Sequence, residues 1–352
     1  MQGSIRIIGV AESPPDPSQM RDNNFVYADL QARGFDVGDK DPAHTEDKVG
    51  IRTRWWSKLT SYQHALIAAR NACADADKRT DGQFQRENIR YIGSGGSSSD
   101  YLFPACAADM QDKLDIPNRV CEVRDSGGLG CSAWVDALIV AASRMRLKNF
   151  RYGLVTGGEC VGSSMNAPDS MSYTLWGDGG AAVVLEYDPD GDPHYGILDD
   201  VNLCDAGVDE RNPNGVHKID WTRSRKQGLH PCHAQYQYSD ASMEGHGKDI
   251  QRWGKTYGAQ ALDEFIGDEP QLPWFIGHSS NLTLVREMGK KAGIPEDRIL
   301  CCTRDRGNPS SVSVPIELAI RVEDGTIKPG DLVYLYAFGT GMVIAGAKLR
   351  WG

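Results

Sequence analysis

Short apolar runs rich in β-formers alternate along the chain with longer segments whose apolar residues recur at helical spacing. The predicted strands are Ile5–Val10, Ile89–Ile92, Leu154–Thr156, Ala181–Glu186, Trp274–Ile276, Leu332–Tyr336 and Val343–Leu349. The predicted helices are Tyr62–Ala76, Pro104–Leu114, Ser132–Arg146, Asp249–Phe265, Leu282–Ala292 and Val314–Glu323. This alternation predicts an α/β fold built from packed layers of helices and sheets.

The second half of the chain repeats segments of the first half in the same order. The paired segments are Ile89–Gly96 with Pro273–Ser280, Val123–Gly127 with Thr303–Gly307, Gly153–Gly157 with Asp331–Leu335, and Trp176–Leu185 with Phe338–Gly346. One such pair is weak evidence, but four in order favour two related halves about a pseudo-twofold axis. We expect an N-terminal half over 1–187, an inserted surface segment over 188–240, and a C-terminal half over 241–352. The insertion contains His194, His217, His230 and His233.

Composition excludes several classes of protein. The 352 residues carry 38 Lys and Arg against 48 Asp and Glu, a net charge of −10, which argues against a partner such as nucleic acid or an anionic membrane. None of the nine cysteines is spaced for a zinc ribbon or a thioredoxin motif. We see neither a signal-peptide pattern nor an apolar run of membrane-spanning length, so we expect a cytoplasmic protein.

Three residues lie at the ends of predicted helices and strands, where a side chain could act in catalysis. Cys131 follows a glycine-rich stretch and opens a predicted helix, where the helix dipole would stabilise a thiolate and free amides could hold an oxyanion. His278 follows the predicted strand Trp274–Ile276, and Asn308 follows what we expect to be a strand ahead of Gly307. A neutral imidazole and a carboxamide are two donors suited to a carbonyl oxygen that gains charge.

Each of these residues also has an ordinary structural explanation. An isolated cysteine is usually an inert buried thiol, and Asn308 before Pro309 suits a turn. We expect the inert role for Cys73, Cys106, Cys121, Cys160, Cys204, Cys301 and Cys302. His230-Pro-Cys-His233 lacks a fourth ligand at a suitable spacing, so we expect no metal. Gly93–Ser97 lacks both the dinucleotide fingerprint and the phosphate-binding lysine.

Together with further motifs, these residues match one known family. The motifs are Gly50–Arg54, Asp100–Pro104, Cys131–Trp134, Gly177–Gly179, His278–Asn281, Gly307–Ser311 and Ile327–Asp331. From about Ile5 to Trp351 the chain resembles the thiolase-like condensing enzymes, specifically β-ketoacyl-acyl-carrier-protein synthase III and its specialised-metabolism relatives. The resemblance implies a thiolase-like fold, with two pseudo-symmetric halves in a five-layer α-β-α-β-α arrangement.

The resemblance also implies a catalytic triad. Cys131 would take an acyl group as a thioester, while His278 and Asn308 would hold the carbonyl of a malonyl donor as it loses CO₂. The amides of Cys131 and Gly341 would form the oxyanion hole. No cofactor is implied beyond the acyl thioester of a carrier protein or CoA.

Other residues acquire expected roles from the same resemblance. Phe103 would cross a homodimer interface to reach the partner's acyl pocket, and Trp134 and Asn281 would contact substrate. Trp134 and the insertion would reshape the pocket. Four positions depart from the housekeeping enzymes, because His44, Lys48, Ser170 and Thr283 replace a tryptophan and three arginines that bind CoA or the carrier protein. These losses favour a specialised pathway, such as polyketide synthesis, with an acyl group delivered by a carrier protein.

Two alternatives stay open at this point. The first is a synthase-III-like acyltransferase that moves the acyl group from Cys131 to a hydroxyl or amine of a small molecule, with His278 as general base. The second is a non-catalytic partner subunit of a heteromeric synthase, which the presence of Cys131 disfavours.

Overall fold

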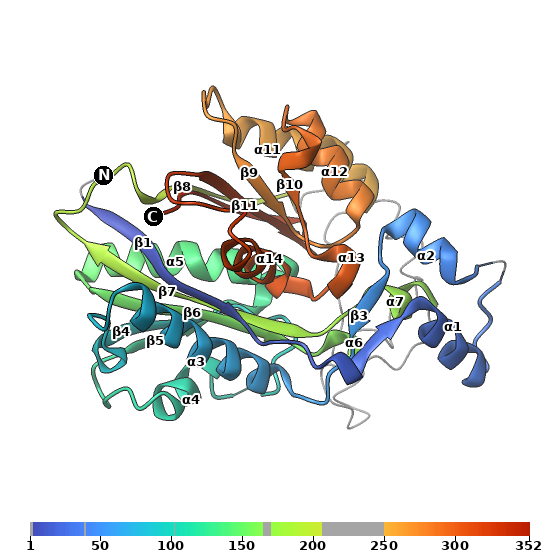
Figure 1. The fold of residues 1–352 in the computed structure, drawn as a ribbon, viewed down its shortest axis with the longest axis horizontal. Coiled ribbons are helices and arrows are strands. Elements are labelled where there is room, and N and C mark those ends of the chain that lie inside the picture. The colour runs from blue at the N-terminus through green and yellow to red at the C-terminus, as the bar shows by residue number, and fades with distance from the viewer. Residues whose placement is uncertain (1–2, 39, 102, 165–169, 206–249) are drawn as a thin grey trace.

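Ten paired strands form the frame of the protein, and their continuous order divides at its centre into two five-stranded sheets with the same strand order (Figure 1). The computed structural model describes residues 3–38, 40–101, 103–164, 170–205 and 250–352. The first sheet, in spatial order, contains β1 (Ser4–Glu12), β7 (Gly179–Asp188), β6 (Tyr152–Glu159), β4 (Ile89–Ser94) and β5 (Glu122–Asp125). The second contains β8 (Gly196–Cys204), β12 (Val343–Arg350), β11 (Leu332–Gly339), β9 (Trp274–Gly277) and β10 (Ile299–Leu300). The sheets join where Ile5 pairs with Gly196.

Helices cover both outer faces and fill the space between the sheets. Against the outer face of the first sheet lie α3 (Ser61–Arg79) and α4 (Cys106–Lys113). Against the outer face of the second lie α11 (Ala259–Ile266) and α12 (Leu282–Lys291). Between the sheets, α5 (Ala133–Lys148) and α14 (Ser313–Glu323) contact strands of both. The five-layer thiolase-like arrangement is therefore confirmed.

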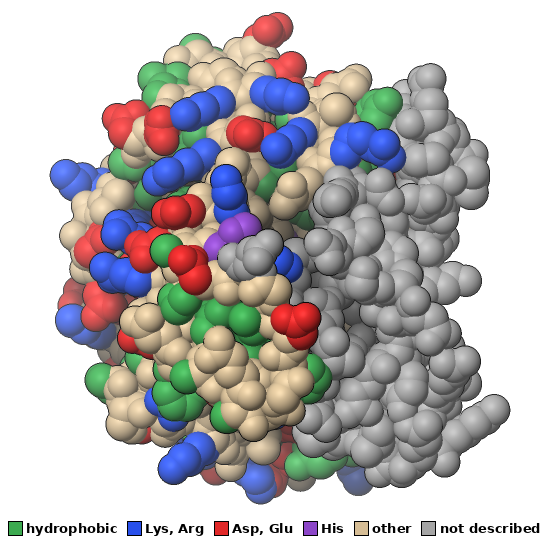
Figure 2. Space-filling model, turned by 90° about the vertical axis from the view of Figure 1, so that its right-hand side faces the viewer, with side chains coloured by type: hydrophobic (Ala, Val, Ile, Leu, Met, Phe, Trp, Pro, Cys, Tyr) green, Lys and Arg blue, Asp and Glu red, His purple; other side chains and the backbone are tan. Residues whose placement is uncertain are grey.

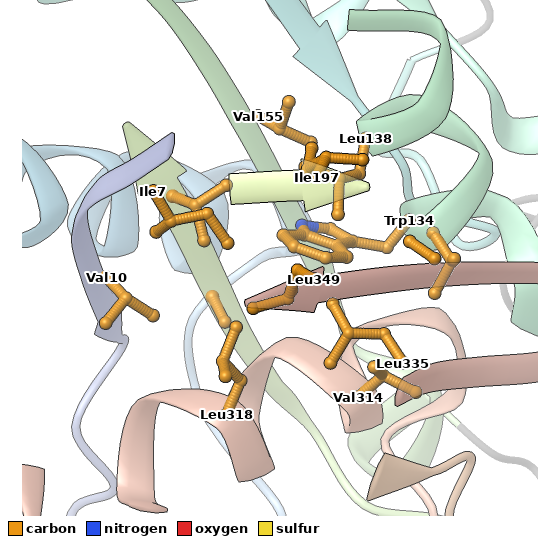
Figure 3. Packing of buried hydrophobic residues seen from close by; sticks show 14 of the residues in the cluster. Ile7, Val10, Trp134, Leu138, Val155, Ile197, Val314, Leu318, Leu335 and Leu349 are labelled. Atoms are coloured by element: carbon orange, nitrogen blue, oxygen red, sulfur yellow. The ribbon is translucent and has the colours of Figure 1, made fainter. Parts of the chain in front are cut away.

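The central layer buries the largest apolar cluster of the molecule. Alternation along β11 explains how one strand serves two layers, because Val333 and Leu335 face α5 and α14 while Tyr334 and Tyr336 face α11 and α12. Figure 3 shows Trp134 of α5 among aliphatic side chains that come from both sheets and from α14. Strands and central helices of the two halves thus share one core.

The expected insertion over 188–240 is wrong in its first part. Residues 196–204 form β8, which pairs antiparallel with β12 along its length and begins the second half. Its pattern is mostly polar because several side chains face solvent, so it carries no clear apolar signature. Of the four histidines, His194 is exposed just before β8. Residues 206–249, with the remaining three, lie outside the described residues.

Shorter elements complete the described structure. They are β2 (Met20–Asp22), β3 (Thr53–Trp55), α1 (Asn23–Ala32), α2 (Pro42–Val49), α6 (Val161–Ser164), α7 (Ser170–Leu175) and α13 (Thr303–Arg306), the 3₁₀ turns η1 (Pro17–Gln19), η2 (Arg86–Asn88), η3 (Gly127–Ser132), η5 (Glu296–Arg298) and η6 (Ser310–Val312), and the π-helical turn η4 (Gly254–Gly258). Among the described residues, no helix combines the length and apolar character needed to span a bilayer.

Candidate active site

The nucleophile candidate lies in a glycine-rich turn at the start of a central helix. Cys131 belongs to η3, immediately before α5, and Gly130 ahead of it has φ +55° and ψ −132°, a combination that favours glycine. The end of β11 packs directly on this turn. A Cβ added to Gly339 would lie 2.4 Å from the Leu129 carbonyl oxygen and 3.0 Å from the Cys131 nitrogen. Gly341 follows in the same β11–β12 loop, and its oxyanion role stays a prediction.

The thiol of Cys131 does not have the lowered pKa that its position at a helix start suggested. Cys131 keeps part of its surface accessible, and its Sγ lies 3.6 Å from the Ser310 hydroxyl oxygen. Burial raises the pKa of the Cys131 thiol to about 12; a hydrogen bond from the Ser310 hydroxyl would lower it, and the negative charge of Glu159 raises it. The resting nucleophile is therefore a protonated thiol at neutral pH.

His278 lies at the end of β9, as predicted, and is only 3% exposed. Its Nδ1 is 2.8 Å from the Ser313 hydroxyl oxygen, and the backbone of Ser310 lies near the ring and acts to raise its pKa. Burial lowers the pKa of His278 to about 3, so the imidazole is neutral at physiological pH. When Ser313 donates to Nδ1, the proton of the neutral ring is on Nε2, where it can be donated to a substrate oxygen.

Asn308, the third predicted residue, follows the short helix α13 and not the strand we expected. Its backbone is fixed by two hydrogen bonds, from Asn308 N to the Leu175 oxygen and from Gly177 N to the Asn308 oxygen, both 3.0 Å. The side-chain Oδ1 accepts from the Ser310 backbone N–H at 2.9 Å. Because Oδ1 is the acceptor there, Nδ2 is the part of the amide that can donate in the site.

Ser310 joins the three predicted residues, and sequence reasoning did not single it out. It contacts the Cys131 sulfur through its hydroxyl, Asn308 through its N–H, and His278 through its backbone. Its φ of +48° is left-handed, which is uncommon for serine and frequent at functional sites. The only sequence signal was its place in the Gly307–Ser311 motif.

Two predicted substrate contacts have structural roles in the described fold. Trp134 is fully buried in the core shared by the two halves, and its role at the substrate stays a prediction. Asn281 is the N-cap of α12, where its Oδ1 accepts from the Leu284 N–H at 3.2 Å. Phe103 is 89% exposed, and its role at an interface stays a prediction.

The cysteines expected to be inert are mostly enclosed. Cys73, Cys160 and Cys302 are buried, but Cys204 is exposed at the end of β8, contrary to expectation. In the described part of the chain, no three His, Cys, Asp or Glu side chains gather closely enough to hold a metal ion. The His230–His233 segment lies outside the described residues.

Comparison with known proteins assigns the chain to a family. Sequence models of 3-oxoacyl-[acyl-carrier-protein] synthase III match residues 128–205, and those of its C-terminal part match residues 268–351. The β-ketoacyl-[acyl-carrier-protein] synthase III of Rhizorhabdus wittichii is 30% identical over 311 residues, which cover 87% of this chain and 89% of that protein. The chain belongs to the β-ketoacyl-acyl-carrier-protein synthase III family. The first matched segment of this synthase III contains Cys131, and the second contains His278 and Asn308.

Solved structures share the fold of this chain over almost its whole length. The 3-oxoacyl-[acyl-carrier-protein] synthase III of Aquifex aeolicus VF5 has a TM-score of 0.78 and 20% identity, covering 99% of this chain and 100% of that one. The priming β-ketosynthase of the R1128 polyketide biosynthetic pathway has a TM-score of 0.79 and 19% identity, covering 99% and 97%. These likenesses show a shared fold.

Proposed function

We propose that this synthase III forms an acyl thioester on Cys131 and condenses it with a malonyl-type thioester by decarboxylative Claisen chemistry. The observation that carries the proposal is the meeting of Cys131, His278 and Asn308 around Ser310. These residues come from both halves of the fold, and the pseudo-symmetric arrangement brings the nucleophile and the donors together.

The loading step is a transfer between two sulfurs. The Cys131 sulfur bonds to the acyl carbon, the donor's carbon–sulfur bond breaks, and the proton of Cys131 ends on the departing thiol. The Cys131 amide, close to the β11–β12 loop, would hold the oxyanion together with an amide of that loop.

The condensing step uses the neutral donors. The Nε2–H of His278 and the Nδ2–H of Asn308 would bind the thioester oxygen of the malonyl group while its carboxylate leaves as CO₂. The resulting carbanion attacks the acyl carbon, the bond to Cys131 breaks, and the departing Cys131 thiolate takes a proton from water. With a pKa of about 3 the His278 ring is neutral, so it offers one N–H hydrogen bond and brings no positive charge into the step.

We also propose that a carrier protein delivers the acyl group in a specialised pathway. Figure 2 shows several Lys and Arg side chains, with Asp and Glu among them, on the upper part of one face. Helix α12 carries Arg286, Lys290 and Lys291, of which Arg286 and Lys290 pair with Glu296. Such a surface would attract the phosphate of a pantetheine arm. On α2, His44 and Lys48 replace the tryptophan and arginine of the housekeeping pattern, which weakens the case for free CoA.

A homodimer built on β5 is part of the proposal. β5 is the edge strand of the first sheet, so its outer edge can accept another strand. Val123 in this strand and Val120 just before it are exposed in the isolated chain, as are Tyr101 and Phe103. A second copy would cover them, and sedimentation of the purified protein checks the stoichiometry.

Intact-protein mass spectrometry tests the function. The protein is incubated with acyl-CoA or acyl-carrier protein, compared with Cys131→Ala, and then given malonyl-carrier protein. We expect an acyl adduct that requires Cys131 and that malonyl donor discharges with release of CO₂. An adduct that resists malonyl donor but is discharged by alcohols or amines would establish acyl transfer instead, and the absence of an adduct with any donor would refute the assignment of the nucleophile.

A further inference from the structure

A buried carboxylate lies behind the catalytic turn and has no part in the chemistry described so far. Glu159 is the last residue of β6 and is fully buried. It accepts hydrogen bonds from the backbone N–H of Ser97 at 2.8 Å and of Ser98 at 2.9 Å, and from the Ser97 hydroxyl at 2.9 Å. The hydroxyls of Ser98 and Ser311 also donate to it. So many donors identify the group as a carboxylate that only accepts.

Two hydroxyl groups connect this carboxylate to the nucleophile. The Ser97 Oγ is 2.8 Å from the Ser310 Oγ, and the Ser310 Oγ is 3.6 Å from the Cys131 sulfur. The contacts form a continuous path from Glu159 through Ser97 and Ser310 to Cys131. It crosses from the first half of the fold to η6 of the second half and back to η3.

The direction of the hydrogen bonds along this path follows from counting protons. A hydroxyl group has one proton to donate, and that of Ser97 is donated to Glu159. The bond between Ser97 and Ser310 therefore uses the proton of Ser310. With its own proton committed, the Ser310 oxygen faces the Cys131 sulfur as an acceptor, so the thiol S–H must be the donor.

We propose that Glu159 is a positioning residue which, through Ser97, fixes the Ser310 hydroxyl as acceptor of the Cys131 S–H, so that the network keeps the resting nucleophile protonated. A hydrogen bond made by the neutral form of an acid opposes its ionisation. The negative charge of Glu159 acts on this thiol in the same direction, whereas a Ser310 hydroxyl that donated to the sulfur would lower the thiol pKa, so the direction of that bond decides the sign of its effect. The inference rests on the proposed function only in taking Cys131 as the nucleophile.

Breaking the path at Ser97 tests the proposal. In Ser97→Ala the proton of Ser310 is released and can turn to the sulfur, where it stabilises the thiolate. A stabilised thiolate corresponds to a pKa lower by about one unit, so we expect iodoacetamide to alkylate Cys131 about tenfold faster at pH 8. The rate is followed by mass spectrometry of the Cys131 peptide across pH 7 to 9.5. Ser99→Ala is the matched control, because Ser99 lies in the same loop but donates to the Tyr101 oxygen.

A double-variant cycle separates this effect from a change in access to the thiol. Ser97 is expected to act through Ser310, so Ser97→Ala should change nothing in a Ser310→Ala background. Equal or slower alkylation of Ser97→Ala than of wild type would overturn the proposal, as would an acceleration that persists without the Ser310 hydroxyl. If Ser97→Ala does not fold, Ser97→Gly serves instead, because it removes the same hydroxyl and leaves the charge of Glu159 in place, and the same acceleration is expected.

Alkylation needs no acyl donor, so the two proposals can fail separately. If Ser97→Ala accelerates alkylation but wild type accepts no acyl group, the positioning role stands and the proposed condensation falls. If wild type condenses acyl and malonyl groups but Ser97→Ala leaves alkylation unchanged, the positioning role falls and the condensation stands.

Discussion

The two halves of this protein each bury a histidine, and the two are alike in most respects. His64 on α3 is fully buried, and His278 after β9 is nearly so. Each ring places Nδ1 beside a serine hydroxyl, Ser13 at 3.0 Å for His64 and Ser313 at 2.8 Å for His278. Burial lowers the pKa of both, to about 4 and about 3. Burial, neutrality and a serine partner therefore do not distinguish a functional histidine from a structural one.

The difference lies in what surrounds the other side of each ring. His64 packs edge-on against Trp55, with ring centroids 4.6 Å apart, and among the described residues its Nε2 has no hydrogen-bond partner. The ring of His278 meets the backbone of Ser310, which also contacts Cys131 and Asn308. Groups from both halves converge on His278, and this convergence marks the site.

The sharpest test of the comparison replaces each histidine by asparagine. We expect His278→Asn to lower the rate of condensation by about 10²–10³-fold, because one of two donors to the developing enolate is lost. Acyl loading of Cys131 should persist within a few-fold, since loading does not use that donor. Product formation and the acyl adduct are measured separately by mass spectrometry.

His64→Asn is the matched control for that experiment, because it removes a comparably buried ring whose described contacts are with Ser13 and Trp55 and not with Ser310. Its rate of condensation should stay within a few-fold of wild type. Equal losses of condensation in both variants would mean that the two rings matter only for stability, and the comparison would fail.

The second prediction concerns acid stability and is made for His64. The folded-state pKa of about 4 is below the unfolded value of 6.5, so the unfolded chain binds a proton that the folded chain does not. The contribution of neutral His64 is complete above pH 6.5 and is lost as pH falls towards 4. At pH 5 the loss is about 2 kcal/mol.

Urea unfolding at pH 7.5 and pH 5 measures this loss. Wild type should lose about 2 kcal/mol more than His64→Asn between the two pH values, because the variant has no ring to protonate. Parallel losses of free energy of unfolding in the two proteins would show that His64 is accessible to protons in the folded state.

The third prediction compares the two serine partners. Ser313 fixes the His278 tautomer that donates from Nε2, so Ser313→Ala should lower condensation about tenfold while loading is retained. Ser13→Ala, which removes the equivalent partner of His64, should leave condensation unchanged. The ratio of condensation to loading is the quantity to measure. A fall of that ratio in Ser13→Ala, or none in Ser313→Ala, would remove the distinction between the two pairs.

The sequence allowed much of the fold to be predicted because its signals are strong and local. The seven predicted strands and the apolar helices are present, with bounds that shift by a few residues. The repeats predicted two halves, and the sheets share one strand order. What was missed lacks an apolar period: β10 has two residues, and β8 is polar because much of it faces solvent. The helix α13, expected as a strand, has only four residues.

The residue types of the site could be predicted from the sequence, but the contacts between them could not. Cys131, His278 and Asn308 could be selected from motifs at predicted element ends. Ser310 and Glu159 could not, since serines are common in loops and a carboxylate at a strand end has no distinctive spacing. Their importance comes from contacts 62 residues apart, as between Ser97 and Glu159, and 213 apart, as between Ser97 and Ser310. Only the folded chain reveals such pairs.

Trp134 supplies the last and smallest test, because the sequence placed it in the substrate pocket and the structure places it in the core. A large residue three positions after the nucleophile suggested a reshaped pocket, but its indole is enclosed by aliphatic side chains from both sheets (Figure 3). Among the described residues its Nε1 has no hydrogen-bond partner, so Trp134→Phe loses packing and no hydrogen bond.

We expect Trp134→Phe to lower the free energy of unfolding by about 1 kcal/mol through the space left by the smaller ring, and to leave acyl selectivity unchanged. Urea unfolding gives the first quantity, and competition between acyl donors of different length gives the second. A shift of the preferred chain length, with stability unchanged, would return Trp134 to the pocket. It would also mean that the core shared by the two halves opens when substrate binds.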